Sequence, residues 1–285
     1  MRRRKLFEAG KKRIKSSASL KFSGPDRDYG LVEPLDNIPS EEELREKMSN
    51  FLVKLNEVDV KKLEFSTRDQ RHSQDWYIER KKRLTASNFG DICKMRVNTS
   101  CRKKVYSLLY GPRVTSKEMS YGIEMEHQAR TLFEQLYEKH VQANGLFVDK
   151  EYAFLAVSPD GLIENTAIIE IKCPYVARST ENAVEAVQQK LLPYCVIKNN
   201  KIELKKEHKY YYQVMGQMRI TGREICYFII YTPIWINVQV IKYDHEFWIT
   251  KMEEKLKIFY LECLLPEIVC PLYGKRLELT DIREP

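Results

Sequence analysis

The chain has 285 residues, of which 43% are hydrophobic and 31% are charged, and its formal net charge is +8. This length suits one large folded domain or one domain with an extension, and no apolar run approaches the ~18 residues that a membrane-spanning helix needs. Seven cysteines without regular spacing or a Cys-x-x-Cys pair argue against a disulfide framework, a zinc ribbon and a cysteine-ligated iron–sulfur cluster, and the N-terminus lacks an apolar signal segment, so we expect a reduced, intracellular protein.

The net charge is concentrated at the N-terminus. Residues 1–22 hold nine Lys and Arg against Glu8, which gives 9 − 1 = +8 and leaves the remaining chain formally neutral. We predict a disordered basic arm and linker over residues 1–39. The two basic clusters resemble a bipartite nuclear-localisation signal, which favours the nucleus in a eukaryote and the cytoplasm otherwise. A solvated tail that touches nucleic acid nonspecifically is an equal alternative.

Two helices are expected next. Ser40 and Glu43 form a capping box, followed by apolar residues at helical spacing, which predicts a helical extension over residues 40–66 without a chemical role. Thr67 is expected to cap a second helix that runs to Arg83. We place the main domain at residues 67–275 and a C-terminal tail at 276–285.

The segment 68–117 is strongly basic. It holds thirteen Lys and Arg against four carboxylates, or 13 − 4 = +9, which favours phosphate binding over a merely solvated helix face. Within it, Arg80 lies near Thr85 and Ser87, either of which could cap a helix over residues 88–95. A guanidinium beside a helix N-terminus with hydroxyls can bind an anion. Arg83 is a close rival to Arg80, and Ser87 could instead be only a cap.

A helix is predicted over residues 121–140. Glu126 lies at the edge of its apolar stripe and points inward, whereas Glu124 lies outside the stripe. An inward carboxylate needs a partner, so Glu126 is a candidate metal ligand. A salt-bridged surface glutamate is the alternative.

The central stretch joins two strand-like runs. Asp160 follows the apolar residues 154–157 within a Ser-Pro-Asp-Gly turn, and residues 167–173 form a β-branched strand. The period of two places Glu170 and Lys172 on one face of that strand. Because burying charge is costly, two carboxylates and an ammonium group here indicate a site for a hard cation, Mg²⁺ with Mn²⁺ as a substitute, rather than a core.

The C-terminal half completes an α/β (α+β) domain in which helices flank a mixed central β-sheet. The expected helices span residues 178–189, 208–220 and 247–265, and the expected strands span 194–198, 201–204, 224–232 and 235–242. Gln213 and Gln217 share a helix face, where neutral amides could donate to phosphate near a metal. A structural amide pair that bridges to backbone is the alternative. The five histidines show no ligand spacing.

These residues carry a family resemblance. Asp160 is followed, after nine residues, by the sequence Glu170-Ile171-Lys172. This spacing resembles the core motif of the PD-(D/E)XK nucleases. Four blocks in order resemble, more narrowly, the lambda-phage exonuclease (YqaJ-type viral recombinase) family over roughly residues 67–250. The blocks are Leu84-Thr85-Ala86-Ser87, Ala129-Arg130-Thr131-Leu132-Phe133-Glu134, Ser158-Pro159-Asp160-Gly161 and Tyr212-Gln213.

The resemblance implies a restriction-endonuclease-like core and specific roles. Glu126, Asp160, Glu170 and the Ile171 carbonyl would hold the metal, and Lys172 would hold or deprotonate the attacking water. The 5′ phosphate would bind Arg80, Ser87 and Ser158, and Gln213 would orient DNA or water. The family carries another acidic residue before the Ser-Pro-Asp-Gly block, and neither Asp149 nor Glu151 falls clearly into register with it.

The expected function is Mg²⁺-dependent hydrolysis of phosphodiester bonds. The resemblance adds processive 5′→3′ digestion of double-stranded DNA in recombination and end processing, a trimeric ring and a single-strand-annealing partner protein. A structure- or site-specific endonuclease on the same core is one alternative. A catalytically idle DNA-binding recombination partner is another, although all three motif residues are intact.

Overall fold

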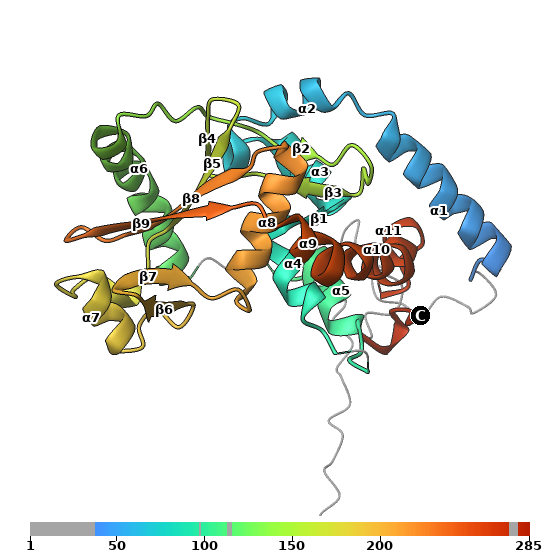
Figure 1. The fold of residues 1–285 in the computed structure, drawn as a ribbon. Helices are drawn as coiled ribbons and strands as arrows, with labels where there is room; N and C mark the ends of the chain where they lie inside the picture. Colours follow the sequence, from blue (N-terminus) through green and yellow to red (C-terminus); the bar gives the residue numbers. More distant parts are fainter. Residues whose placement is uncertain (1–37, 97, 113–115, 274–278) are drawn as a thin grey trace, which may run out of the picture.

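The computed structural model describes residues 38–96, 98–112, 116–273 and 279–285. The predicted basic arm and its localisation signal therefore lie outside the described residues, except for residues 38 and 39. The first helix is α1 (Glu41–Asn56), and the predicted capping box is confirmed: the Glu43 N–H donates to Ser40 Oγ, and the Ser40 N–H donates to the Glu43 carboxylate. Leu55 anchors α1 in the main core, and α1 packs beside α11 (Leu265–Val269) at the edge of the molecule (Figure 1).

The prediction of one helix from Thr67 to Arg83 is wrong. The chain forms α2 (Val60–Ser66), the 3-10 turn η2 (Gln70–His72) and α3 (Gln74–Lys81) instead. Thr67 ends α2: its buried hydroxyl donates to the Leu63 carbonyl at 2.7 Å and accepts from the Leu146 N–H at 2.8 Å. This long-range bond to residue 146 outweighs the local capping preference of Thr67, which is all that the sequence pattern could show.

A small sheet has the strand order β1-β3-β2, made of β1 (Leu84–Thr85), β3 (Leu155–Val157) and β2 (Phe147–Val148). β1 and β3 are parallel, with Thr85 opposite Ala156. The carboxyl ends of parallel neighbours lie at the same sheet edge. The segments that begin at Ala86 and at Ser158 therefore start side by side.

The main sheet has the order β4-β5-β8-β9. Its strands are β4 (Gly161–Ile163), β5 (Ala167–Lys172), β8 (Ile225–Tyr231) and β9 (Ile236–Lys242). β5 and β8 are parallel, whereas β4 with β5 and β8 with β9 are antiparallel. The sheet is thus mixed, as the sequence predicted, and β5 lies in its interior.

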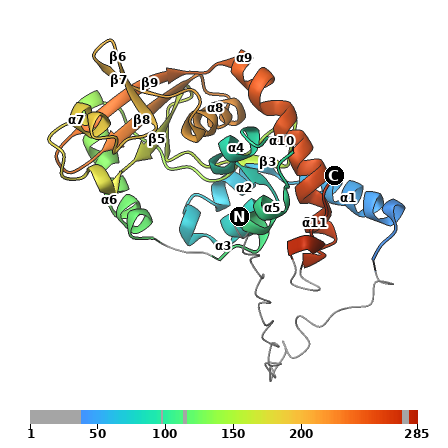
Figure 2. The ribbon, with the colours of Figure 1, turned by 90° about the horizontal axis from the view of Figure 1, so that it is seen from below.

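Helices cover both faces of this sheet (Figures 1 and 2). On one face, α6 (Lys117–Tyr137) buries Met125, Ala129 and Phe133 against Ile169 and Ile171 of β5. On the other face lies α8 (Lys209–Thr221), which ends at Gly222 in the left-handed conformation, φ 67°, as predicted. The alternation of β5 side chains therefore sends its charged residues toward α8 and its isoleucines 169 and 171 toward α6.

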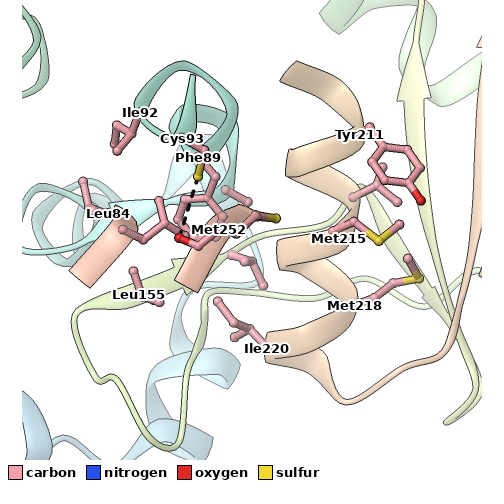
Figure 3. Close-up of a cluster of buried hydrophobic side chains, with 14 of the residues drawn as sticks. Leu84, Phe89, Ile92, Cys93, Leu155, Tyr211, Met215, Met218, Ile220 and Met252 are labelled. Atoms are coloured by element: carbon pink, nitrogen blue, oxygen red, sulfur yellow. Dashed lines mark hydrogen bonds between the residues drawn. The ribbon is translucent and has the colours of Figure 1, made fainter. Parts of the chain in front are cut away.

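The largest core lies between α8 and α4 (Ala86–Cys93), as Figure 3 shows. Phe89 of α4 is fully buried, and Gly216 of α8 lies against its ring, so a larger residue at 216 would collide with it. Met215 and Met218 fill the space on the sheet side of α8. This packing fixes α4, and with it the segment 85–87, relative to α8.

The remaining elements surround this frame. They are α5 (Arg102–Leu109), η3 (Tyr175–Ala177), α7 (Ala183–Gln188), β6 (Cys195–Lys198), β7 (Lys201–Leu204), α9 (His245–Phe247), η4 (Trp248–Glu253), α10 (Glu254–Ile258), η5 (Phe259–Leu264) and η6 (Leu279–Asp281). The β6–β7 hairpin and its two positive-φ asparagines, at 199 and 200, are as predicted. The helix predicted over 178–189 is only α7, because Asn182 caps its start. Residues 279–285, predicted as a tail, pack on the domain through buried Ile282.

None of the helices in the described ranges is long and apolar enough to cross a membrane.

The cap residue of α8 gives a prediction of pH-dependent stability. Burial, together with Lys209, Lys94 and Lys205, lowers the pKa of His208 to about 4. Between pH 6.5 and 4 the unfolded chain binds this proton and the folded protein does not, so stability falls as the pH falls through that window. We expect a contribution on the order of 1 kcal/mol, because the ring is partly exposed. Urea unfolding of wild type and His208→Asn at pH 7 and pH 4.5 tests it: a constant difference between the two proteins would contradict the expectation.

Candidate active site

The hairpin of β4 and β5 brings Asp160 against the end of β5. The Asp160 N–H donates to the Ile169 carbonyl at 3.2 Å, and Asp160 Oδ2 accepts from the Ile171 N–H at 2.6 Å. Asp160 thus lies beside the stretch that contains Glu170 and Lys172. The sequence predicted this proximity, although the partner of β5 is β4 rather than the strand before the turn.

Glu170 is almost fully buried and is bound by three donors. Lys172 and Gln213 both donate to Oε1, the latter at 2.7 Å, and Gln217 donates to Oε2 at 2.7 Å. The Lys172 ammonium also lies 4.6 Å from the centre of the Tyr210 ring. Both amides come from α8, so the face of α8 that carries them holds the carboxylate in one orientation.

Glu126 approaches from the opposite side, on α6. It pairs with Arg130 at 3.1 Å, and Arg130 also donates to the Asp160 carbonyl at 2.7 Å. Glu126 and Asp160 line the same polar cavity. The inward orientation predicted for Glu126 therefore places it beside Asp160, with Arg130 bridging the two.

The charges of this group influence one another. Burial raises the pKa of Asp160 well above its ordinary range, and the nearby Glu170 and Glu126 raise it further. Burial alone would lower the pKa of Lys172, but Glu170 and Asp160 raise it above its ordinary value, so the side chain is an ammonium ion in the protein without a metal. Three carboxylates face two cations, the Lys172 ammonium and the Arg130 guanidinium, which leaves a local excess of negative charge that a metal ion would neutralise.

A second group forms at the ends of the parallel strands β1 and β3. Thr85 Oγ1 lies 3.5 Å from Arg80 Nη2 and 3.4 Å from Ser87 Oγ. Trp76 stacks under the Arg80 guanidinium at 4.0 Å and donates through its indole N–H to Ser158 Oγ at 2.9 Å. We call Arg80, Ser87 and Ser158 the anchor group. Ser158 precedes Asp160 by two residues, which connects the anchor group to the carboxylates.

Arg83 is not part of the anchor group. Its fully buried side chain pairs with Glu79 and donates to the Ala153 carbonyl at 2.8 Å. The prediction that Arg83 could bind DNA phosphate is therefore wrong, because the side chain faces the interior. The sequence alone could not show which of Arg80 and Arg83 faces the interior, since both flank the same turn.

Asp149 and Glu151 also lie outside the group formed by Asp160, Glu170 and Lys172. Asp149 caps its own turn by accepting from the N–H groups of Glu151 and Tyr152, and both carboxylates pair with Arg219. In the described structure neither contacts Asp160, Glu170 or Lys172. These contacts give both residues a structural role.

Three contributors had no assigned role of their own at the site: Gln217, named only as the helix-face neighbour of Gln213, and Arg130 and Trp76. Each acts through another residue. Gln217 binds Glu170, and Arg130 binds Glu126 and the Asp160 carbonyl. Trp76 contacts Arg80 and donates to Ser158. The spacing of Gln217 from Gln213 was a usable signal, since i,i+4 residues share a helix face. Nothing in the sequence pointed from Trp76 to Ser158, which are 82 positions apart.

The comparison with protein families decides the family. The model of the YqaJ-like viral recombinase domain matches residues 75–224, more than half of the chain. The chain belongs to this family. The matched range includes every predicted site residue, and the resemblance seen in the sequence motifs is confirmed. No curated protein matches the chain.

Solved structures agree with the fold of this YqaJ-like domain. The chain is similar to an alkaline exonuclease, LHK-Exo, from Laribacter hongkongensis, with 25% identity and a TM-score of 0.53 over 69% of this chain and 94% of that one. LHK-Exo in complex with dAMP matches with 24% identity and a TM-score of 0.55 over 73% of this chain and all of that one. The predicted fold class, an α/β domain with a PD-(D/E)XK-like core, is confirmed.

Gln217 provides a prediction about the orientation of Glu170. Its Oε1 is buried without a partner, which costs stability, while its amide N–H donates to Glu170. We expect Gln217→Leu to lower nuclease turnover about 10- to 100-fold, and to lower the melting temperature because it leaves the buried Glu170 Oε2 without its donor. Exposed Gln135 of α6 is the matched control, and Gln135→Leu should retain full turnover. A folded Gln217→Leu protein with full turnover would contradict the orienting role.

Proposed function

We propose that this protein is a metal-dependent exonuclease that hydrolyses phosphodiester bonds of double-stranded DNA, 5′→3′ from a 5′-phosphorylated end, in recombination and end processing. The observation that carries the proposal is the placement of Asp160 against the end of β5, which carries Glu170 and Lys172, with Glu126 lining the same cavity as Asp160. Family membership supports it, as does the likeness to LHK-Exo, which is described as an alkaline exonuclease.

The residues fit a hard divalent cation by their chemistry. Glu126, Asp160 and Glu170 offer carboxylate oxygens, the ligands that Mg²⁺ prefers, with Mn²⁺ as a substitute. The raised pKa of Asp160 reflects a crowding of negative charge that such a cation would relieve. In the described ranges no three acidic, His or Cys side chains already surround one point. Glu170 faces α8 and Glu126 faces Arg130, so these side chains would have to turn toward Asp160, with the Ile171 carbonyl as a further donor.

The chain's own groups divide the remaining work. When bound, the cation supplies Lewis-acid polarisation of the scissile phosphate. Gln213 and Gln217 hold Glu170, and Glu170 holds the Lys172 ammonium, which can donate to a phosphate oxygen or orient the attacking water. Lys172 can take up a proton from that water only after losing its own, which requires the carboxylates around it to be neutralised first.

The anchor group would bind the 5′ phosphate. Arg80 is held by the Trp76 ring, and burial lowers the pKa of Arg80 to about 10, so it stays charged at neutral pH. Ser87 is exposed in the first turn of α4, where backbone N–H groups could also donate to a phosphate. A homotrimer and a single-strand-annealing partner protein remain proposals drawn from the family resemblance.

The polarity of digestion and the recognition of the 5′ phosphate are tested with duplexes that differ in the label or the chemical group at one end. Linear duplexes labelled at the 5′ or at the 3′ terminus of one strand are digested in Mg²⁺, each with a 5′ phosphate or a 5′ hydroxyl. We expect 5′ label to be released first as a mononucleotide, and the 5′-phosphorylated ends to be degraded about tenfold faster, since a charge-assisted phosphate contact contributes ~1–2 kcal/mol. Early release of the 3′ label would refute the proposed polarity.

A further inference from the structure

A polar cavity of about 280 Å³ adjoins the candidate active site on the α6 side of the sheet. The segment 68–72, α6 and the turn that carries Asp160 contribute to its wall, whereas neither Glu170 nor Lys172 lines it. We propose that this cavity binds a backbone phosphate of the DNA substrate, as a subsite separate from the anchor group. The proposal rests on the proposed function and names a further place where that substrate is held.

The segment that forms the rim is fixed to the active-site turn. Gln70 adopts a left-handed conformation, φ 41°, and its amide N–H groups donate to the carbonyls of Asn144, at 3.0 Å, and Pro159, at 3.1 Å. A left-handed residue other than glycine costs on the order of 1 kcal/mol, which these two bonds offset. The rim residues Arg71 and His72 are thereby held at a fixed place beside Asp160.

The cations around the cavity differ in how they are paired. Arg68 is bound to Glu64 at 3.0 Å, and Arg130 is bound to Glu126 and to the Asp160 carbonyl. Arg71 donates only through Nε, to His72 Nε2 at 3.3 Å, and within the described ranges its two terminal nitrogens have no protein acceptor. Arg71 therefore presents an exposed guanidinium end at the mouth of the cavity, and bidentate guanidinium–phosphate contacts are strong.

Two polar atoms in the wall are buried without a partner. Asn144 is 1% exposed and its Oδ1 has no donor, and Arg130 Nε has no acceptor. Leaving such groups unpaired costs about 1–3 kcal/mol each, so a ligand or water is expected beside them. A phosphate oxygen can accept from Arg130 and Arg71, and a water held next to it can donate to Asn144. The wall also carries the carboxylates of Asp69, Glu126 and Asp160, and Arg130 is paired with Glu126, so the phosphate is expected at the mouth of the cavity beside Arg71.

The test measures DNA binding by the full chain in EDTA, which prevents cleavage. Binding of 5′-phosphorylated and 5′-hydroxyl duplexes is titrated from 50 to 300 mM salt for wild type, Arg71→Ala, Arg80→Ala and Arg45→Ala. Arg45 is the matched control, because it is exposed on α1 and, among the residues that the structure describes, is paired only with Glu41. We expect Arg71→Ala to weaken binding several-fold and to reduce the slope of log Kd against log salt by about 0.9, the value for one phosphate contact.

The outcomes separate the cavity from both the anchor group and the nuclease activity. Arg71→Ala should keep the preference for a 5′ phosphate, which Arg80→Ala should lose. The separate subsite is refuted if Arg71→Ala and Arg45→Ala bind DNA with the same affinity and the same slope of log Kd against log salt. It is also refuted if Arg71→Ala loses the preference for a 5′ phosphate. A wild-type protein that binds DNA but never cleaves it in Mg²⁺ would refute the nuclease, while a reduced slope for Arg71→Ala would still support the subsite.

Discussion

Replacing Lys172 by alanine is expected to lower phosphodiester hydrolysis by about 10³-fold or more, while the protein stays folded and binds DNA. The reason is that Lys172 provides the ammonium group of the site, held by Glu170 and by the Tyr210 ring beside three carboxylates. A general acid–base group or a charge aimed at the transition state contributes roughly 10²–10⁴-fold. Release of acid-soluble nucleotides from linear duplex, with the melting temperature measured alongside, checks the expectation.

Lys205→Ala is a suitable control for this variant. Lys205 donates to the Pro193 carbonyl, outside the candidate site, so its removal makes the same change in net charge. If Lys172→Ala and Lys205→Ala hydrolyse DNA at the same rate, Lys172 has no catalytic role. Lys172→Arg then separates two roles, since an arginine supplies charge but does not deprotonate in proteins and could not act as a base.

Replacing Asp160 by asparagine is expected to abolish activity and to stabilise the protein without metal. Asparagine can still accept the Ile171 N–H bond, so the hairpin is kept. The substitution removes one of three crowded carboxylates, which should raise the free energy of unfolding by about 1 kcal/mol, or the melting temperature by ~2–4 °C in EDTA. Activity should fall on the order of 10³-fold, because a central metal ligand is lost.

The effect of Asp160→Asn on the free energy of unfolding is expected to depend on pH. The folded protein holds the Asp160 proton more tightly than the unfolded chain, because the pKa of Asp160 is raised. Asp160 therefore favours folding at low pH and disfavours it as the pH rises through the folded pKa. The stability advantage of Asp160→Asn should grow from acid to neutral pH in EDTA, and Mg²⁺ should stabilise only the wild type. A variant that is less stable than wild type at every pH would contradict the proposed crowding.

The sequence predicted the parts of the site that local patterns determine. The period of two placed Glu170 and Lys172 on one face of β5, and the helical period turned Glu126 inward. The capping box of α1 and the glycine stop of α8 were also confirmed, because caps depend on neighbouring residues alone.

The errors arose where distant contacts override local preference. Thr67 ends a helix instead of starting one, because its hydroxyl binds the backbone of residue 146. Arg83 turns inward to Glu79 and to a carbonyl 70 positions away, while Arg80 stacks on Trp76. A single sequence contains no information about such pairings, so it could not choose between the two arginines.

The most direct test of the central claim compares wild type and Lys172→Ala on a linear and on a covalently closed circular duplex, in Mg²⁺ and in EDTA. If the carboxylates at the end of β5 form an exonuclease site, wild type in Mg²⁺ degrades the linear duplex and leaves the circle intact, and neither EDTA nor Lys172→Ala permits cleavage. Nicking or cutting of the circle would indicate an endonuclease. If wild type leaves both substrates intact in Mg²⁺, the proposed active site is wrong.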